Sequence, residues 1–118
     1  MQLQELKQHL DIDVDGALAR FSGVESLYLK YLKRFAEGDK SYNEFVLACE
    51  SHDIKEIEES AHALKGICGN LGLNDLYTRY DRIVSAARRD ELVEALALAE
   101  GAKDATYQCM TLLQQLSS

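Results

Sequence analysis

Apolar residues recur three and four positions apart along most of the chain, which is the spacing of amphipathic helices. Asp13 is a candidate N-cap for a short first helix over 14–20, and a Phe-Ser-Gly sequence interrupts the pattern after it. A long helical segment follows from about Glu25 to Glu50, and Gly38-Asp39 in its middle is expected to bend or loosen it. The residues expected to face the core from this segment are Leu27, Tyr28, Tyr31, Phe35, Tyr42, Phe45 and Cys49.

Three further helices are predicted, and the first of them has the clearest boundaries. Asp53 and Glu56 form a capping-box pattern at its start, and Gly72 takes the position that usually closes a helix. Asn74 is the expected N-cap of the next helix, and Asp90 that of the last, which extends to about residue 116. The expected apolar faces of these three helices consist of Ile54, Ile57, Ala61, Leu64, Cys68 and Leu71; Leu76, Tyr80, Ile83 and Ala87; and Leu92, Leu96, Ala99, Ala102, Tyr107, Met110 and Leu113.

The chain has 118 residues, which suits one domain, and it contains no proline. Proline breaks helix interiors, so its absence favours long helices joined by short turns. The sequence therefore predicts a single all-α domain over residues 1–118. Its expected architecture is an antiparallel up-down four-helix bundle, with a short extra N-terminal helix covering one end.

The charge balance is acidic, with 20 Asp and Glu against 13 Lys and Arg and a formal net charge of −7. Such a surface repels phosphate backbones and anionic lipids, so neither nucleic acid nor a membrane is an expected partner. No apolar run approaches the roughly 20 residues that span a bilayer, and the N-terminal sequence lacks the pattern of a signal peptide. Three widely spaced cysteines do not form a disulfide framework, so we expect a reducing, cytoplasmic environment.

The predicted helix that starts after Asp53 carries a histidine on its polar face. Successive residues rotate by about 100° around a helix, which places His62 about 135° from the middle of the apolar stripe. Gly66 lies further out still, and Gly69 projects within about 20° of His62. Lys65 follows one turn along, and Glu58 flanks the histidine on the previous turn. Each glycine inside a helix costs about 1 kcal/mol relative to alanine, so this bare strip indicates a surface that another macromolecule approaches closely.

An exposed imidazole offers a nitrogen lone pair near neutral pH and can act as a nucleophile toward phosphorus. The ammonium of Lys65 could neutralise the phosphoryl oxygens as a point charge. Phosphoryl transfer commonly uses Mg²⁺, but no clustered carboxylates accompany His62 that would bind it. We therefore expect neither a metal nor a cofactor on this chain, and expect the partner to bring the Mg²⁺. No ATP-binding motif is present, which favours a passive phosphocarrier over a complete enzyme.

The sequence AHALKGICGNLG, from Ala61 to Gly72, resembles the phosphorylation motif of histidine-containing phosphotransfer (HPt) domains. The family pattern is a histidine, a Leu-Lys-Gly sequence that starts two residues later, and a glycine that ends the helix. The segment from Asp11 to Phe35, with its Ala-Arg-Phe sequence, Gly23 and a Leu-Tyr pair, resembles the N-terminal part of HPt domains in hybrid sensor kinases. The resemblance extends over nearly the whole chain.

This resemblance implies a phosphorelay in two-component signal transduction. A receiver-domain aspartate would donate its phosphoryl group to His62, and a second receiver aspartate would accept it. By position in the motif, Lys65 would stabilise the phosphoryl group and Gly66 would leave room for the receiver. Many members also have a polar residue near the histidine on the next helix, for which Arg79 and Arg82 are the nearest candidates here. The candidate partner-docking residues are Glu58, Gly66, Gly69, Arg79 and Arg82.

Two other interpretations of the same residues stay open. The chain could be a helical scaffold or interaction domain without phosphochemistry, with His62 as an ordinary surface residue. It could also be the substrate domain of a chemotaxis-type kinase, phosphorylated directly by an ATP-binding domain. The N-terminal part that resembles hybrid kinases favours receiver domains as partners. His9 and His52 lack neighbouring glycines and are interpreted as surface residues.

Overall fold

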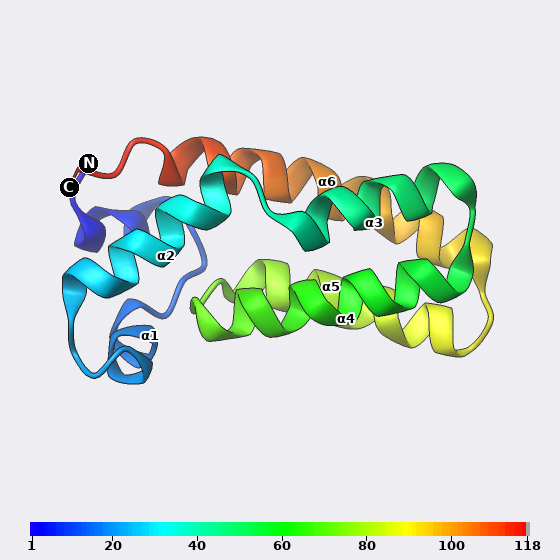
Figure 1. Cartoon of the computed structure of the whole chain (residues 1–118), viewed down its shortest axis with the longest axis horizontal. Coiled ribbons are helices and arrows are strands. Elements are labelled where there is room, and N and C mark those ends of the chain that lie inside the picture. The colour runs from blue at the N-terminus through cyan, green and yellow to red at the C-terminus, as the bar shows by residue number, and fades with distance from the viewer. Residues whose placement is uncertain (118) are drawn as a thin grey trace.

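The computed structural model describes residues 1–117, and these fold as an all-α domain (Figure 1). They form a 3₁₀ helix, η1 (Leu3–Gln8), and the α-helices α1 (Val14–Arg20), α2 (Glu25–Glu37), α3 (Lys40–Ser51), α4 (Ile54–Asn70), α5 (Asn74–Arg88) and α6 (Leu92–Leu113). Within this part of the chain, β-type pairing is limited to an isolated antiparallel bridge between Ile12 and Leu73. The all-α prediction is confirmed.

Helices α3 to α6 lie along the long axis of a molecule measuring 40 × 23 × 22 Å (Figure 1). Helix α4 packs against α3 on one side and α5 on the other, and α6 packs against α5 and α2 (Figure 1). The 3₁₀ helix and α1 lie at one end beside α2 (Figure 1). Both termini also lie at this end, where the amino group of Met1 donates to the carbonyl of Gln115 at 2.9 Å.

The predicted long helix over 25–50 is divided into two helices rather than bent. Helix α2 ends at Glu37, and Gly38 adopts a φ of 144°, which an L-residue rarely reaches. The carboxylate of Asp39 then accepts a hydrogen bond from the Tyr42 N–H at 2.9 Å and starts α3 as its N-cap. Gly38 thus ends α2, and the N-cap at Asp39 directly begins α3, so the segment forms two helices.

Two residues predicted for the core of this segment are in fact exposed. Leu27 and Tyr31 are 37% and 38% exposed, whereas Tyr28 and Phe35 are buried. The buried face of α2 follows Tyr28, Leu32, Phe35 and Ala36, so the helix is rotated by about one residue from the predicted stripe. Leu27 and Tyr31 thus lie at the edge of this buried face. Helical spacing alone did not distinguish the edge of the face from its centre.

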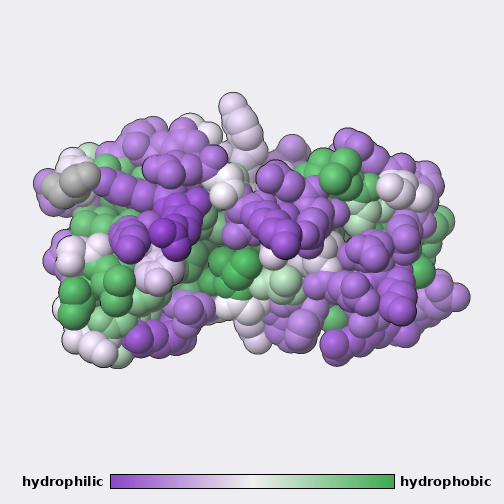
Figure 2. Space-filling model, in the orientation of Figure 1, coloured by the Kyte–Doolittle hydropathy of each residue, from purple (hydrophilic) through white to green (hydrophobic). Residues whose placement is uncertain are grey.

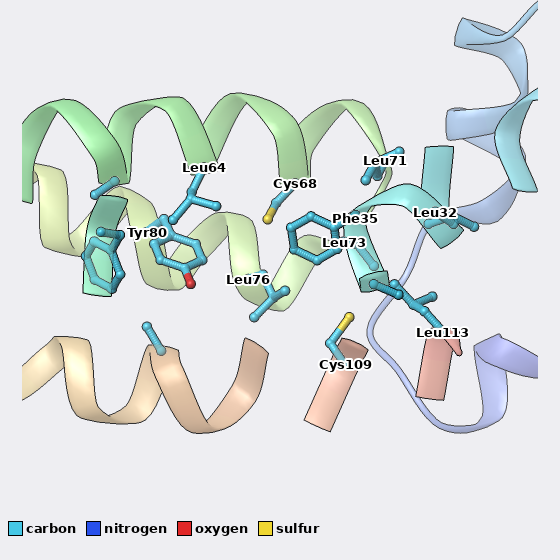
Figure 3. Packing of buried hydrophobic residues seen from close by; sticks show 14 of the residues in the cluster. Leu32, Phe35, Leu64, Cys68, Leu71, Leu73, Leu76, Tyr80, Cys109 and Leu113 are labelled. Atoms are coloured by element: carbon cyan, nitrogen blue, oxygen red, sulfur yellow. The ribbon is translucent and has the colours of Figure 1, made fainter. Parts of the chain in front are cut away.

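The core runs along the inner faces of α2 to α6 (Figure 3). The predicted apolar stripe of α4 is confirmed by the buried side chains of Ile57, Ala61, Leu64 and Cys68. The predicted face of α5 is likewise buried, as Leu76, Tyr80, Ile83 and Ala87 all show. In α6 the prediction of Tyr107 was wrong, because that side chain is 72% exposed. Its neighbour Thr106 takes the inward position and its Oγ1 lies 2.6 Å from the buried Tyr80 hydroxyl.

The predicted helix caps divide into two that are confirmed and two that are wrong. The carboxylates of Asp13 and Asp53 accept from backbone N–H groups at the starts of α1 and α4. Asn74 instead forms the first residue of α5, and its N–H donates to the Asp11 carbonyl. Asp90 adopts a φ of 58° in the turn before α6, so neither helix has a side-chain N-cap.

Figure 2 shows that hydrophilic residues cover most of one face, with apolar patches between them. None of the helices described here is long and apolar enough to cross a bilayer.

Candidate functional site

His62 lies in the middle of α4 with its side chain exposed. The outward direction follows from the buried stripe on the same helix, because residues one position after an inward residue point about 100° away from it. Ala61 is fully buried immediately before His62, and Leu64 is fully buried two positions after it. The core therefore fixes the rotation of α4 and holds the imidazole toward solvent, as the spacing predicts.

The imidazole lies in a shallow depression on the molecular surface. The depression contains residues of α4, one residue from the first turn of α5 and the last residue of α1. Its lining comprises Arg20, His62, Ala63, Lys65, Gly66, Ile67, Gly69, Asn70 and Tyr77. Three of the sequence-predicted residues beside the histidine, namely Lys65, Gly66 and Gly69, are thus brought together with it.

The two glycines of this surface serve different purposes. A methyl group built on Gly66 would meet no neighbouring atom within 4 Å, so this turn of α4 is open to an approaching molecule. A methyl group on Gly69 would lie 3.0 Å from Cδ2 of Tyr77, which is closer than van der Waals contact allows. Gly69 therefore makes room for a side chain of α5. The sequence favoured a bare strip at both positions and left a tight helix–helix contact at Gly69 as the alternative, and the structure shows that contact.

The Lys65 side chain extends from α4 to α5 and contacts two residues there. Its Nζ lies 2.8 Å from Oδ1 of Asp81 and 5.6 Å from the centre of the Tyr77 ring. The hydrogen bond to the Asp81 carboxylate is the main reason that the pKa of Lys65 is raised above its ordinary value. The ammonium therefore stays charged at neutral pH. It lies one helical turn from His62 and faces the same depression.

The remaining predicted docking residues are engaged elsewhere. Glu58 forms an ion pair with Arg88 of α5 at 3.7 Å. Arg79 pairs with Asp75 on its own helix at 2.9 Å. Its guanidinium also extends over Gly101 of α6. Arg82 lines a separate depression between α5 and α6. The structure does not bring Arg79 or Arg82 into the depression around His62, because α5 turns other residues toward α4.

Four residues of the site were missed in the sequence: Arg20, Asn70, Tyr77 and Asp81. Tyr77 and Asp81 are four positions apart on α5, so they share a face, but helical spacing does not say which neighbour that face meets. The antiparallel pairing is visible in the structure as two successive contacts. Gly69 meets Tyr77, and Lys65 meets Asp81.

The end of α4 is tied down by residues near the N-terminus. Arg20 Nη1 donates to the carbonyls of Gly69 and Asn70 at 3.0 and 3.3 Å. The Tyr28 hydroxyl donates to the Leu71 carbonyl at 2.6 Å, and burial is the main cause that raises the pKa of this phenol. The bonds to Asn70 and Leu71 satisfy carbonyls that a helix end otherwise leaves unpaired, and the bond to Gly69 adds to the one its carbonyl accepts from the Gly72 N–H. Together they fasten the end of the helix on which His62 lies to α1 and α2.

The site combines an exposed nucleophile, a fixed ammonium and open space on the adjoining turn. No group of three or more His, Cys, Asp or Glu that could hold a metal ion occurs within residues 1–117. His9 and His52 are exposed at helix ends, and neither lines this depression. Comparison with protein-family models, curated proteins and solved structures yields no match to the chain.

Proposed function

We propose that this chain is a phosphorelay intermediate of two-component signal transduction, of the HPt type. In this proposal α4, α5, α6 and the consecutive pair α2–α3 are the four arms of an up-down helical bundle. The bundle presents His62 as the phosphorylated residue. A receiver-domain aspartate donates the phosphoryl group, and a second receiver aspartate accepts it.

One observation carries the proposal. An exposed imidazole stands beside a turn on which a side chain at Gly66 would meet nothing within 4 Å. Glycine in mid-helix costs about 1 kcal/mol relative to alanine, and nothing in the local packing calls for it here. Open space beside a nucleophile suits a partner protein whose reactive group is recessed below its own surface, because the two surfaces must then approach closely. The shallow, widely open depression suits a macromolecular partner better than a small molecule.

The reaction is an in-line exchange of the phosphoryl group between oxygen and nitrogen. The unprotonated ring nitrogen of His62 attacks phosphorus, the N–P bond forms, and the P–O bond to the aspartyl carboxyl breaks. The donor leaves as a carboxylate, and the ring keeps the proton on its other nitrogen. In the second transfer a receiver carboxylate attacks phosphorus, the N–P bond breaks, and its electron pair returns to the ring nitrogen, so that His62 leaves as a neutral imidazole. The Lys65 ammonium offsets charge on the phosphoryl oxygens.

The partner supplies what this site lacks in the proposal. Phosphoryl transfer of this kind uses Mg²⁺, and the receiver domain is expected to hold it. The chain itself acts as a carrier without an ATP site, and the donor receiver in this proposal belongs to a hybrid sensor kinase. Its net charge of −7 disfavours nucleic acid as a partner. A cytoplasmic location belongs to the same proposal and agrees with three free, buried cysteines.

The test is phosphoryl transfer from a receiver domain labelled with radioactive acetyl phosphate. We expect acid-labile, alkali-stable label on the wild-type chain and none on the His62→Gln variant. His9→Gln and His52→Gln are matched controls, because both residues are exposed histidines outside the depression. Both variants should accept label at the wild-type rate.

Undiminished labelling of the His62→Gln variant would overturn the site. Absence of label on the wild-type chain with a panel of phosphorylated receivers would favour a helical scaffold without phosphochemistry. Label that appears only with an ATP-loaded kinase domain would instead favour the substrate domain of a chemotaxis-type kinase.

A further inference from the structure

Lys65, which lines the same depression as His62, forms an ion pair with Asp81. Nζ and Oδ1 are 2.8 Å apart, a distance typical of a charge-assisted hydrogen bond. The Tyr77 ring covers the ammonium from another side at 5.6 Å. The Lys65 side chain is only 26% exposed, although it belongs to the surface of the bundle.

The contact joins two helices, unlike a pair of neighbours on one helix. Asp81 and Tyr77 are one turn apart on α5 and approach Lys65 from across the α4–α5 interface. The Lys65 side chain is therefore directed toward α5 and cannot point freely into solvent.

A phosphoryl group on His62 would compete with Asp81 for the same ammonium. His62 and Lys65 are three positions apart on α4, so their side chains are neighbours on the helix surface. A phosphoryl group adds about two negative charges and three acceptor oxygens within that range. Lys65 then faces two anions, and the Asp81 carboxylate withholds part of its charge from the phosphoryl group.

We propose that Asp81 is a positioning residue that weakens the hold of Lys65 on the phosphoryl group and so keeps phosphorylated His62 ready to pass it on. The inference rests on the proposed function, because it assigns the acceptor strength of His62 to a neighbouring ion pair. A carrier must bind the group neither too strongly nor too weakly to serve both a donor and an acceptor. Asp81 sets that balance through Lys65 and has no contact with the reacting atoms.

The test uses phosphoramidate, a small donor that needs no protein partner. Its P–N bond breaks as the N–P bond to the imidazole forms, and ammonia leaves. The background carries His9→Gln and His52→Gln, so that only His62 can react. At fixed concentrations of phosphoramidate and ammonia, the ratio of phosphorylated to free His62 is read by ³¹P NMR and intact mass.

We expect Asp81→Asn to raise this ratio by about two- to five-fold, in the range that exposed ion pairs contribute. Lys65→Gln should lower it. The Asp81→Asn change should disappear in the Lys65→Gln background, because the carboxylate acts through the ammonium. Asp75→Asn is the matched control, since Asp75 is a carboxylate on the same helix that pairs with Arg79 instead. It should leave the ratio unchanged.

An unchanged ratio in Asp81→Asn would overturn the inference, as would an increase that persists without Lys65. Circular dichroism is recorded for each variant, and only variants with the wild-type helix content are compared, so that a change in ratio is not a consequence of unfolding. The outcome is independent of the receiver experiment. Failure of every receiver to label the chain overturns the proposed function, whereas phosphoramidate decides the role of Asp81.

Discussion

Replacing Gly66 by alanine should make the protein more stable, although this glycine lies at the centre of the proposed site. Gly66 occupies the interior of α4, four positions before the helix ends. A Cβ at this position would meet no atom within 4 Å, so the substitution adds no steric cost. Its effect is then the gain in helix propensity, together with the loss of conformational freedom in the unfolded chain.

The magnitude follows from these two terms. Alanine is favoured over glycine by about 0.8–1 kcal/mol in a helix interior. We expect Gly66→Ala to raise the free energy of unfolding by about 0.5–1 kcal/mol and Tm by roughly 2–5 °C. Gly69→Ala is the matched comparison on the same helix. Its Cβ would lie 3.0 Å from the Tyr77 ring, so displacement of that ring should cancel the gain.

Urea denaturation followed by circular dichroism measures both variants. The reasoning is refuted if Gly66→Ala is no more stable than the wild type, or if Gly69→Ala gains as much stability as Gly66→Ala. A functional arm uses Gly66→Leu, whose side chain fills the open space beside His62. This variant should remain folded and lose at least ten-fold in the rate of labelling by a receiver. A normal rate would mean that the partner does not approach over this turn.

Three further predictions concern the fold. Tyr80→Phe removes one partner of the buried 2.6 Å hydrogen bond to Thr106 and should cost about 1–2 kcal/mol in urea unfolding, whereas the double variant with Thr106→Val should recover part of that loss. Asp53→Ala removes the N-cap of α4 and should cost about 1 kcal/mol, with no loss expected from Asn74→Ala because Asn74 caps no helix. Burial raises the pKa of the Cys109 thiol to about 12, so stability should hold below pH 8.5, where an unfolded thiol begins to ionise, and fall as pH rises toward 12. Urea unfolding between pH 7 and 10 tests this, and a slope that is the same in Cys109→Ala would contradict it.

The exposure of His62 could be predicted because it depends on one helix alone. The stripe through Ile57, Ala61 and Leu64 identifies the inward direction, and helix geometry then fixes every other residue relative to it. The caps at Asp13 and Asp53 were predictable for the same reason, since each bonds to an N–H three residues away. The rotation of α2 was predicted less well because polar and apolar residues are mixed on both of its edges.

The surroundings of the histidine were decided by the tertiary structure. Lys65 meets Asp81 only because α4 and α5 pair antiparallel in one register. Arg20 reaches the end of α4 across an interval of 49 residues. Helical periodicity says which residues share a face, but not which face of a neighbouring helix they meet, because that depends on how whole apolar surfaces pack together. The sequence alone therefore determined where His62 points, and the packing of α1, α4 and α5 decided which charges surround it.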